Sequence, residues 1–239
     1  MLEGAAPSLY SGFRPVLLSD YMKIGLVSAT LFEIQPALRF IEELPAGFPH
    51  QLEPVITGVG TMAVTYQVAS ALGRSKWDYL LQAGIGGSFS DRLSLADVVL
   101  VQEEIMGDTG VEEESFRDLF DMGFAEADKF PYTGKGLVNP FVSGWESLSL
   151  PLVRGLTVNE ITTRPARLQQ LREKYAPGVE SMEGAGFHYA CLMQGVPFLQ
   201  LRSISNQVGE RNKSKWNIGG AIGTLNKALM RIIQQLTAS

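Results

Sequence analysis

The eight residues VESMEGAG, at positions 179–186, form the most informative pattern in this 239-residue chain. Residues 179–182 have the composition of a short strand, and the small and apolar residues from 185 to 193 predict a helix directly after it. Glu183 lies between the two, in small and apolar surroundings with no evident solvent-facing side. Because a buried carboxylate needs a partner or a chemical task, Glu183 is a candidate functional residue.

The apolar segment 198–205 (FLQLRSIS) predicts a strand with polar side chains near its end. Arg202 and Asn206 flank Ser205 there. In sheets that are covered by helices, ligands bind beyond the carboxyl ends of the strands. We therefore expect these polar groups to face a ligand at that edge of the sheet.

Strands and helices alternate along the rest of the chain. The expected strands are 23–29, 52–57, 79–83, 98–106, 155–159, 179–182 and 198–205, and the expected helices are 36–44, 62–75, 167–175, 185–193 and 218–236. This alternation implies a mostly parallel sheet with helices on both faces. Residues 107–150 are the least regular part and are expected to form loops with short helices.

Two further strand ends carry residues that allow two interpretations. The segment GIGG at 84–87 follows a strand, and glycines there serve either a tight turn or a close approach of the backbone to a ligand. Glu33 follows the first strand, and its simplest role on the residues alone is a helix-start carboxylate that interacts with the helix dipole. For both features the structural and the functional interpretation stay open at this point.

The composition excludes several classes of function. The chain has 20 basic and 25 acidic residues, and its formal charge of −5 argues against nucleic-acid or anionic-membrane partners, because these need a basic surface. No apolar run approaches the ~20 residues that span a bilayer. The single cysteine excludes a disulfide within the chain and favours a reducing compartment, so a cytoplasmic location is expected.

The sequence implies neither a metal nor a cofactor. His188 and Cys191 lie three residues apart and can share a helix face, but a zinc site needs three or four ligands. Core packing is therefore the simpler role for both. Residues 1–21 lack apolar periodicity and are expected to form a disordered extension, which leaves 22–239 as one catalytic domain.

Several segments together resemble the superfamily of purine nucleoside phosphorylases and nucleosidases. They are KIGLV at 23–27 with Glu33, VESMEGAG at 179–186, GVPF at 195–198 and RSISN at 202–206, and their order and spacing agree from residue 22 to about 237. Within the superfamily the chain is similar to the futalosine hydrolase branch of menaquinone biosynthesis, through DTGVEE at 108–113, FRDL at 116–119 and MGF at 122–124. The resemblance implies an α/β fold: a single-domain three-layer α/β/α arrangement with a mixed, twisted central sheet.

The resemblance also implies a role for each candidate residue. Glu33 would orient and deprotonate a water molecule, and Asn206, supported by Ser205, would hold the departing base. Glu183 would bind the ribose hydroxyls, and such bonds favour the transition state when they strengthen as charge develops. The other candidates would bind the substrate: Met182 would pack on the ribose, Arg202 would hold Glu183, Gly84 and Ile85 would line the sugar, and Thr162 would border the purine.

Two choices follow from the chemistry of these positions. The phosphorylases place arginines after the first strand and before the glycine turn, because a phosphate dianion favours bidentate cationic donors, whereas this chain has Glu33 and residues 81–83 (LQA) there. A carboxylate repels phosphate, so water is the expected nucleophile. Asn206 offers a donor for O6 and an acceptor for the protonated N7 of a 6-oxopurine, whereas the resemblance implies Asp there in the adenine-releasing members.

The expected reaction is hydrolysis of futalosine to hypoxanthine and dehypoxanthine futalosine. A homo-oligomer that binds a small nucleoside is expected, with no nucleic-acid or membrane partner. Two alternatives stay open: an adenine-releasing nucleosidase, and an inactive nucleoside-binding or storage protein. The presence of both Glu33 and Glu183 argues against the inactive protein.

Overall fold

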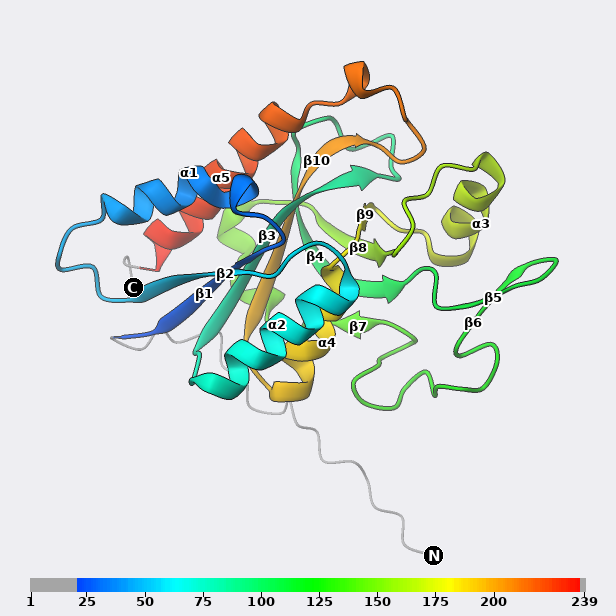
Figure 1. The fold of residues 1–239 in the computed structure, drawn as a ribbon, viewed down its shortest axis with the longest axis horizontal. Helices are drawn as coiled ribbons and strands as arrows, with labels where there is room; N and C mark the ends of the chain where they lie inside the picture. Colours follow the sequence, from blue (N-terminus) through cyan, green and yellow to red (C-terminus); the bar gives the residue numbers. More distant parts are fainter. Residues whose placement is uncertain (1–20, 237–239) are drawn as a thin grey trace, which may run out of the picture.

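The computed structural model describes residues 21–236, so the extension predicted for residues 1–21 lies outside the described residues apart from Tyr21. In this part of the chain a mixed eight-stranded sheet forms the centre (Figure 1). Its strands are β1 (Lys23–Ser28), β2 (Gln51–Ile56), β3 (Tyr79–Ser88), β4 (Val98–Met106), β7 (Leu137–Val138), β8 (Leu152–Thr157), β9 (Val179–Ser181) and β10 (Phe198–Gln207). The helices are α1 (Leu31–Glu42), α2 (Thr61–Arg74), α3 (Pro165–Tyr175), α4 (Gly184–Gln194) and α5 (Ile218–Gln235).

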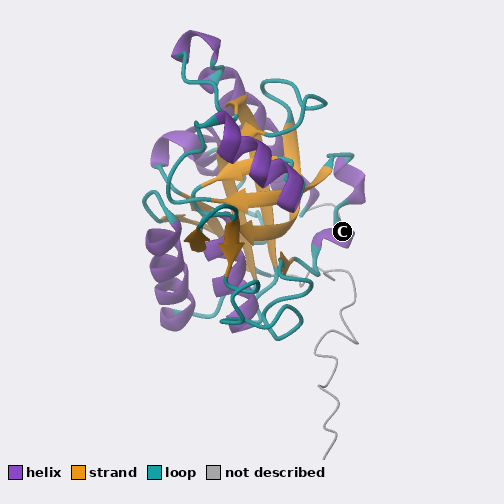
Figure 2. Ribbon diagram, turned by 90° about the vertical axis from the view of Figure 1, so that its right-hand side faces the viewer, coloured by secondary structure: helices purple, strands orange, loops and turns teal. Residues whose placement is uncertain are grey.

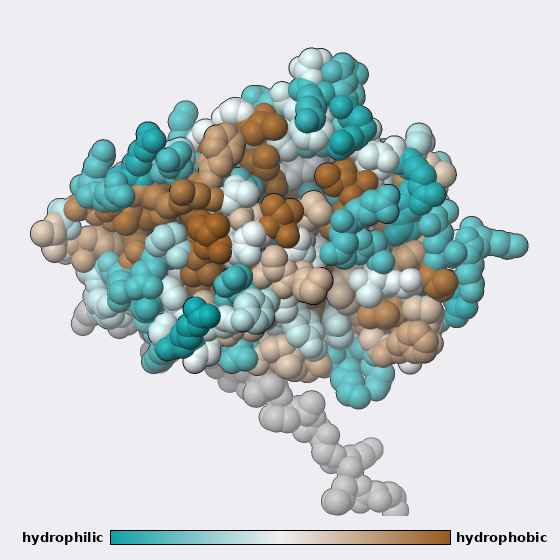
Figure 3. All heavy atoms as spheres, viewed as in Figure 1, coloured by the Kyte–Doolittle hydropathy of each residue, from teal (hydrophilic) through white to brown (hydrophobic). Residues whose placement is uncertain are grey.

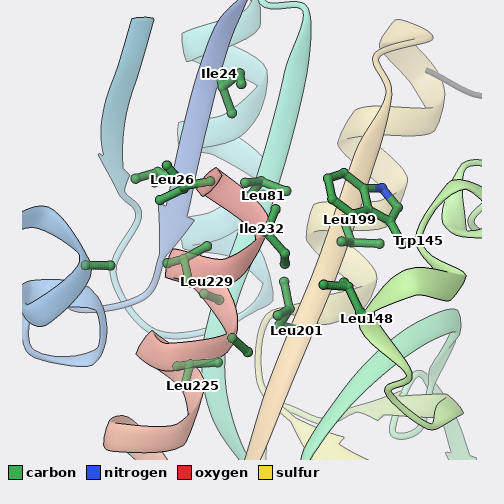
Figure 4. Packing of buried hydrophobic residues seen from close by; sticks show 14 of the residues in the cluster. Ile24, Leu26, Leu81, Trp145, Leu148, Leu199, Leu201, Leu225, Leu229 and Ile232 are labelled. Carbon is green, nitrogen blue, oxygen red and sulfur yellow. The ribbon is translucent and has the colours of Figure 1, made fainter. Parts of the chain in front are cut away.

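Helices cover both faces of the sheet, which confirms the predicted three-layer α/β/α class (Figures 1 and 2). Helices α1 and α5 pack together on one face, and α2 and α4 pack together on the other. On the α5 face, Leu225, Leu229 and Ile232 meet strand residues such as Leu81 and Leu201, all of them buried (Figure 4). These residues form one apolar stripe along the helix, and this stripe faces the core.

The sheet closes on itself around β3. Strand β3 pairs in parallel with β1 and β10, and its last two residues also pair antiparallel with β9. Since β10 continues through β4 and β8 back to β9, five strands form a ring. The predicted strand ended at residue 83, whereas β3 runs through the glycines to Ser88. The reason is steric: a Cβ on Gly86 would lie 2.8 Å from the carbonyl oxygen of Glu180, so only glycine lets β9 approach here.

Helix α1 begins five residues before the position predicted from Pro36. Thr30 and Glu33 form a capping box at its start, which the sequence-based boundary missed. Pro36, which has no N–H to donate, lies inside the helix. The buried amide of Asn226 on α5 bonds to the same turn: its Nδ2 donates to the Glu33 carbonyl at 2.8 Å, and its Oδ1 accepts the Ala37 N–H at 2.9 Å. The neighbouring helix thus supports the turn that contains the proline.

Residues 107–150 are irregular, as expected. They contain the small hairpin of β5 (Gly110–Glu112) and β6 (Phe116–Asp118), the short strand β7, and two short 3₁₀ turns at Val142–Gly144 and Glu146–Leu148. Over residues 21–236, no helix has the length and apolar character needed to cross a membrane. His188 and Cys191 are both buried on α4, in the packing role preferred for them above.

Candidate active site

Glu33 lies at the end of β1, in the first turn of α1, and is 8% exposed. Its Oε2 accepts hydrogen bonds from the Thr30 N–H at 3.1 Å, the Thr30 hydroxyl at 2.9 Å and the Ser28 hydroxyl at 3.3 Å. Its Oε1 accepts one from the Ile85 N–H at 3.0 Å. The two interpretations of Glu33 are therefore compatible: one oxygen caps the helix, and the other reaches the glycine-rich part of β3, residues 84–87.

Glu183 is the residue that precedes α4, and it is buried as the sequence suggested. Its Oε1 accepts the Gly60 N–H at 3.1 Å, and its Oε2 pairs with Arg202 Nη1 at 3.4 Å. Arg202 comes from β10 and is 1% exposed. A buried guanidinium needs such a partner, because an uncompensated buried charge is costly. Beside Glu183, the Met182 carbonyl accepts the Thr61 hydroxyl at 3.1 Å.

Gly84 joins these two carboxylates into one cluster. A Cβ at Gly84 would lie 2.3 Å from Arg202 Nη1 and 3.2 Å from Glu33 Oε1, so a side chain there would displace one of them. Arg202 Nη1 and Glu33 Oε1 thus lie on the same side of β3, the side to which a Gly84 side chain would project. The structure brings together, from four separate segments of the chain, the residues for which the resemblance implies roles around the ribose: Glu33, Gly84, Ile85, Met182, Glu183 and Arg202.

The base-side candidates follow on the next residues of β10. The Ser205 hydroxyl lies 2.8 Å from Asn206 Oδ1, to which it donates, and 3.1 Å from the Gly86 carbonyl. Asn206 Nδ2 donates to the Gln207 carbonyl at 2.9 Å. A shift of register between Ile204 and Asn206 places Asn206 beside Gly87 of β3. The contact from Ser205 is the one that a supporting role requires, and it leaves the amide a second lone pair and a second N–H for a ligand.

Thr162 lies apart from the sugar-side cluster, on the loop after β8. Its N–H donates to Glu180 Oε1 at 3.2 Å, and the residue is 5% exposed. A hollow of about 440 Å³ opens beside it, between this loop and the β5–β6 hairpin. Its lining includes Asp108, Phe116, Thr162 and Arg167. None of the sugar-side candidates lines this hollow, so the hollow and the sugar-side cluster are two distinct regions of the structure.

A buried polar network lies next to Glu183, and it was not predicted from the sequence. Glu104 of β4 is 1% exposed, its Oε1 is 2.8 Å from Gln200 Nε2, and its Oε2 accepts the Thr157 hydroxyl at 2.8 Å. Thr157 Oγ1 in turn accepts the Ala185 N–H at 2.7 Å, in the first turn of α4. Burial raises the pKa of Glu104 to about 7. An acid inside the apolar run VVLVQEEIM was the signal that could have revealed it.

His188 extends this network on the far side of Gln200. Burial lowers the pKa of His188 to about 4, so its ring is neutral, and Nδ1 lies 2.8 Å from the Leu137 carbonyl, to which it donates. Gln200 Oε1 and His188 Nε2 have no partner among the described residues when the Gln200 amide nitrogen faces Glu104. A half-turn of that amide satisfies every group if Glu104 carries a proton. The network is thus self-consistent with a neutral Glu104.

Two more groups at the site were not predicted as functional. The Gly60 N–H, which follows the predicted strand 52–57, bonds to Glu183. A main-chain donor has no residue-type signature, so the sequence could not mark it as functional. Glu180 bonds to Thr162, and burial raises its pKa. The Glu180 carboxylate bonds to the main-chain N–H of Thr162, and helix α3 separates the two residues in the sequence. No local sequence pattern could therefore predict this pairing. Within the described residues, no group of three or more His, Cys, Asp and Glu side chains is arranged to hold a metal.

Comparisons with known proteins show the family to which this chain belongs. The model of the phosphorylase superfamily matches residues 23–238. Futalosine hydrolase of Thermus thermophilus is 30% identical over 187 residues, which are 75% of this chain and 80% of that protein. The Streptomyces coelicolor protein of the same name is 33% identical over 166 residues, 68% of each chain. The native structure of futalosine hydrolase of Helicobacter pylori has the same fold, with a TM-score of 0.73, 20% identity, and 90% of this chain and 98% of that chain covered. The chain therefore belongs to the phosphorylase superfamily, within the futalosine hydrolase family.

Proposed function

We propose that this protein hydrolyses the N-ribosidic bond of futalosine and releases hypoxanthine and dehypoxanthine futalosine, a step of menaquinone biosynthesis. The observation that carries the proposal is the contact between the Glu33 carboxylate and the Ile85 N–H. It brings a carboxylate to the glycine-rich part of β3, where a phosphorylase would need cationic donors. The negative charge of Glu33 would repel a phosphate dianion there, whereas the same carboxylate can act as a base towards a water molecule.

In the proposed reaction, water attacks the anomeric carbon while its proton passes to Glu33. The electron pair of the ribosidic bond leaves with the purine, which takes up a proton from solvent at N7, and Glu33 afterwards returns its proton to solvent. The sugar passes through an oxocarbenium-like state, by analogy with O-glycosides. Glu183, held by Arg202 and the Gly60 N–H, would bind the ribose hydroxyls and stabilise the positive charge as it develops.

The identity of the base is supported by Asn206. Its side chain presents one donor and one acceptor, the pattern that matches O6 and the protonated N7 of a 6-oxopurine. An adenine-releasing enzyme would instead need a donor for N7 and an acceptor for the 6-amino group. Ser205 supports the amide, since its hydroxyl donates to Asn206 Oδ1. These contacts favour hypoxanthine as the product base.

The direct test is incubation with futalosine, aminodeoxyfutalosine, inosine and methylthioadenosine, with and without phosphate, followed by chromatography of the products. We expect hypoxanthine from futalosine at a rate that does not depend on phosphate. A ribose 1-phosphate adduct would refute hydrolysis, adenine release as the main reaction would favour the second nucleosidase candidate, and binding without turnover would indicate a binding protein.

We also propose that the protein acts as a homo-oligomer in the cytoplasm. Support for assembly comes from apolar side chains around the start of α1 and along α2, because contiguous exposed apolar surface marks interaction sites. Phe32 is 65% exposed, Met62 84% and Tyr66 66%. Figure 3 shows apolar residues gathered over the α1 and β2 side of the molecule. Sedimentation of the wild type and of Met62→Lys would test this, and a monomeric wild type would refute it.

A further inference from the structure

Glu180 has a buried oxygen with no partner. The residue is 6% exposed, its Oε1 accepts the Thr162 N–H at 3.2 Å, and its Oε2 has no hydrogen-bond partner among the described residues. Leaving a buried polar atom unpaired costs free energy, more so when it carries charge. An anchor for the Thr162 loop would need only one oxygen. The second oxygen therefore suits a donor that arrives with the substrate.

The register of the sheet places Glu180 opposite Asn206. Gly87 of β3 pairs with Glu180 of β9 on one side and with Asn206 of β10 on the other. Residues paired across adjacent strands project from the same face of a sheet, and strands lie about 4.8 Å apart, so the two side chains flank Gly87 with roughly 10 Å between their stems. Gly87 itself has no side chain, and its Cβ position lies 3.3 Å from Asn206 Nδ2. The Val208 side chain also packs there, with Cγ2 3.0 Å from the same position, so a flat ring between the carboxylate and the amide would lie against Val208.

The surroundings agree with this placement. The hollow of about 440 Å³ is lined by Thr162, to which Glu180 bonds, and by Asp108 and Arg167, whose charges act on Glu180. The Arg167 guanidinium lies over the ring of Phe116 at 4.1 Å, and its Nη2 donates to the Gly107 carbonyl at 2.6 Å. Its Nη1 is buried and also has no hydrogen-bond partner among the described residues, and no ion pair within 4 Å joins Arg167 to Glu180. The free oxygen of Glu180 is thus not committed to the nearest cation.

We propose that the free oxygen of Glu180 accepts the N1–H of a 6-oxopurine, so that Glu180 and Asn206 read the base on both sides of O6. This proposal rests on the proposed function and names a specificity-determining residue for it. An ionised carboxylate only accepts hydrogen bonds. It therefore matches the N1–H of hypoxanthine and opposes the N1 lone pair of adenine. Discrimination against 6-aminopurines then comes from two positions on two strands.

The test is equilibrium binding of three free bases, measured by calorimetry: hypoxanthine, 1-methylhypoxanthine and adenine. The methylated base keeps O6 and N7 and lacks only the N1–H donor. Wild type should bind hypoxanthine roughly 10- to 100-fold more tightly than 1-methylhypoxanthine, the ratio expected when one buried acceptor is left unpaired. In Glu180→Ala this preference should largely disappear. Glu173→Ala, which removes an exposed carboxylate on α3, should leave it unchanged.

Glu180→Gln serves as the isosteric variant and carries the test if the alanine variant does not fold. Its amide can donate to the N1 of adenine, so the preference for hypoxanthine over adenine should fall about tenfold or more. Equal weakening of all three bases in both variants would show that Glu180 only anchors the Thr162 loop, and would overturn the proposal. Wild-type turnover of futalosine is scored separately: its absence refutes the proposed function, whereas turnover with unchanged base ratios refutes only the role of Glu180.

Discussion

The side-chain amide of Asn226 bonds to the main chain of Glu33. It bridges the Glu33 carbonyl and the Ala37 N–H, the two groups that an uninterrupted helix pairs with each other. Asn226 is 2% exposed and also donates to the Ile222 carbonyl of its own helix. The residue proposed as the general base is thus fixed to α5 through its backbone, while its side chain is fixed to β3.

Asn226→Ala should lower both stability and turnover. The loss of buried hydrogen bonds should cost about 1–3 kcal/mol in the free energy of unfolding. A small displacement of Glu33 should reduce kcat by roughly tenfold or more, because misplaced catalytic groups lose rate steeply, with little effect on KM. Lys227→Ala, at the next, exposed position of α5, is the control. An unchanged kcat in a correctly folded Asn226→Ala variant would mean that the amide only stabilises the helix pair.

Glu33→Gln separates the two tasks of Glu33. Glutamine keeps an oxygen for Thr30 and suits the third position of a capping box, so the fold should be retained. The amide is not a base, and kcat should fall about 10²- to 10⁴-fold. Glu33→Ala should lose the cap as well, with about 1 kcal/mol of stability. Melting curves and turnover of the two variants decide this, and retained kcat in Glu33→Gln would assign water activation to another group.

Asn206→Asp should reverse the preference for the base. An ionised aspartate faces O6 with a lone pair, and leaving that group unpaired costs roughly 1–3 kcal/mol, or about one to two decades in kcat/KM for futalosine. A protonated aspartic acid can instead donate to N7 of a 6-aminopurine, so the ratio of aminodeoxyfutalosine to futalosine turnover should rise. Both substrates must be compared in a variant of verified melting temperature. An unchanged ratio would remove Asn206 from the base site.

Glu104 should make stability fall as the pH rises. Its pKa lies at about 7 in the folded protein, above the ordinary glutamate value of 4.5, because burial disfavours the charged form. The folded state therefore retains a proton that the unfolded state has lost, and the stabilisation that is present below pH 4.5 is lost between there and about pH 7. By linkage this amounts to about 3 kcal/mol. The stability of Glu104→Gln minus that of wild type, from urea unfolding at pH 5 and pH 8, should increase with pH. A constant difference would show that Glu104 is ionised throughout.

The sequence predicted the site where a residue type stood out against its neighbours. Glu183 was conspicuous because a carboxylate among small apolar residues has no ordinary reason to be there, and Arg202 and Asn206 stood out at the end of an apolar strand. Glu104 had the same signal but was obscured by its acidic neighbour Glu103, which forms an ion pair with Arg154.

Other features depend on pairings that no local pattern encodes. The ring of strands forms because the end of β3 meets β9, which is remote in sequence, and because glycines make room for it. The turn of α1 that contains Pro36 is bonded by Asn226 of α5, at the other end of the chain. The Gly60 N–H belongs to a main chain whose position is set by tertiary packing alone.

The pairing of β10 with β3 also bears on how the protein reaches its native state. Glu33 comes from α1, whereas Arg202 and Asn206 come from β10, so the pocket depends on contacts between distant parts of the chain. Such contacts form slowly, because closing the long loop between the two segments costs conformational entropy before the contacts contribute any favourable energy. After dilution from denaturant, we expect helical circular dichroism to recover first and turnover to recover only in the slowest phase. For this protein, catalytic activity would then be the most stringent measure of refolding.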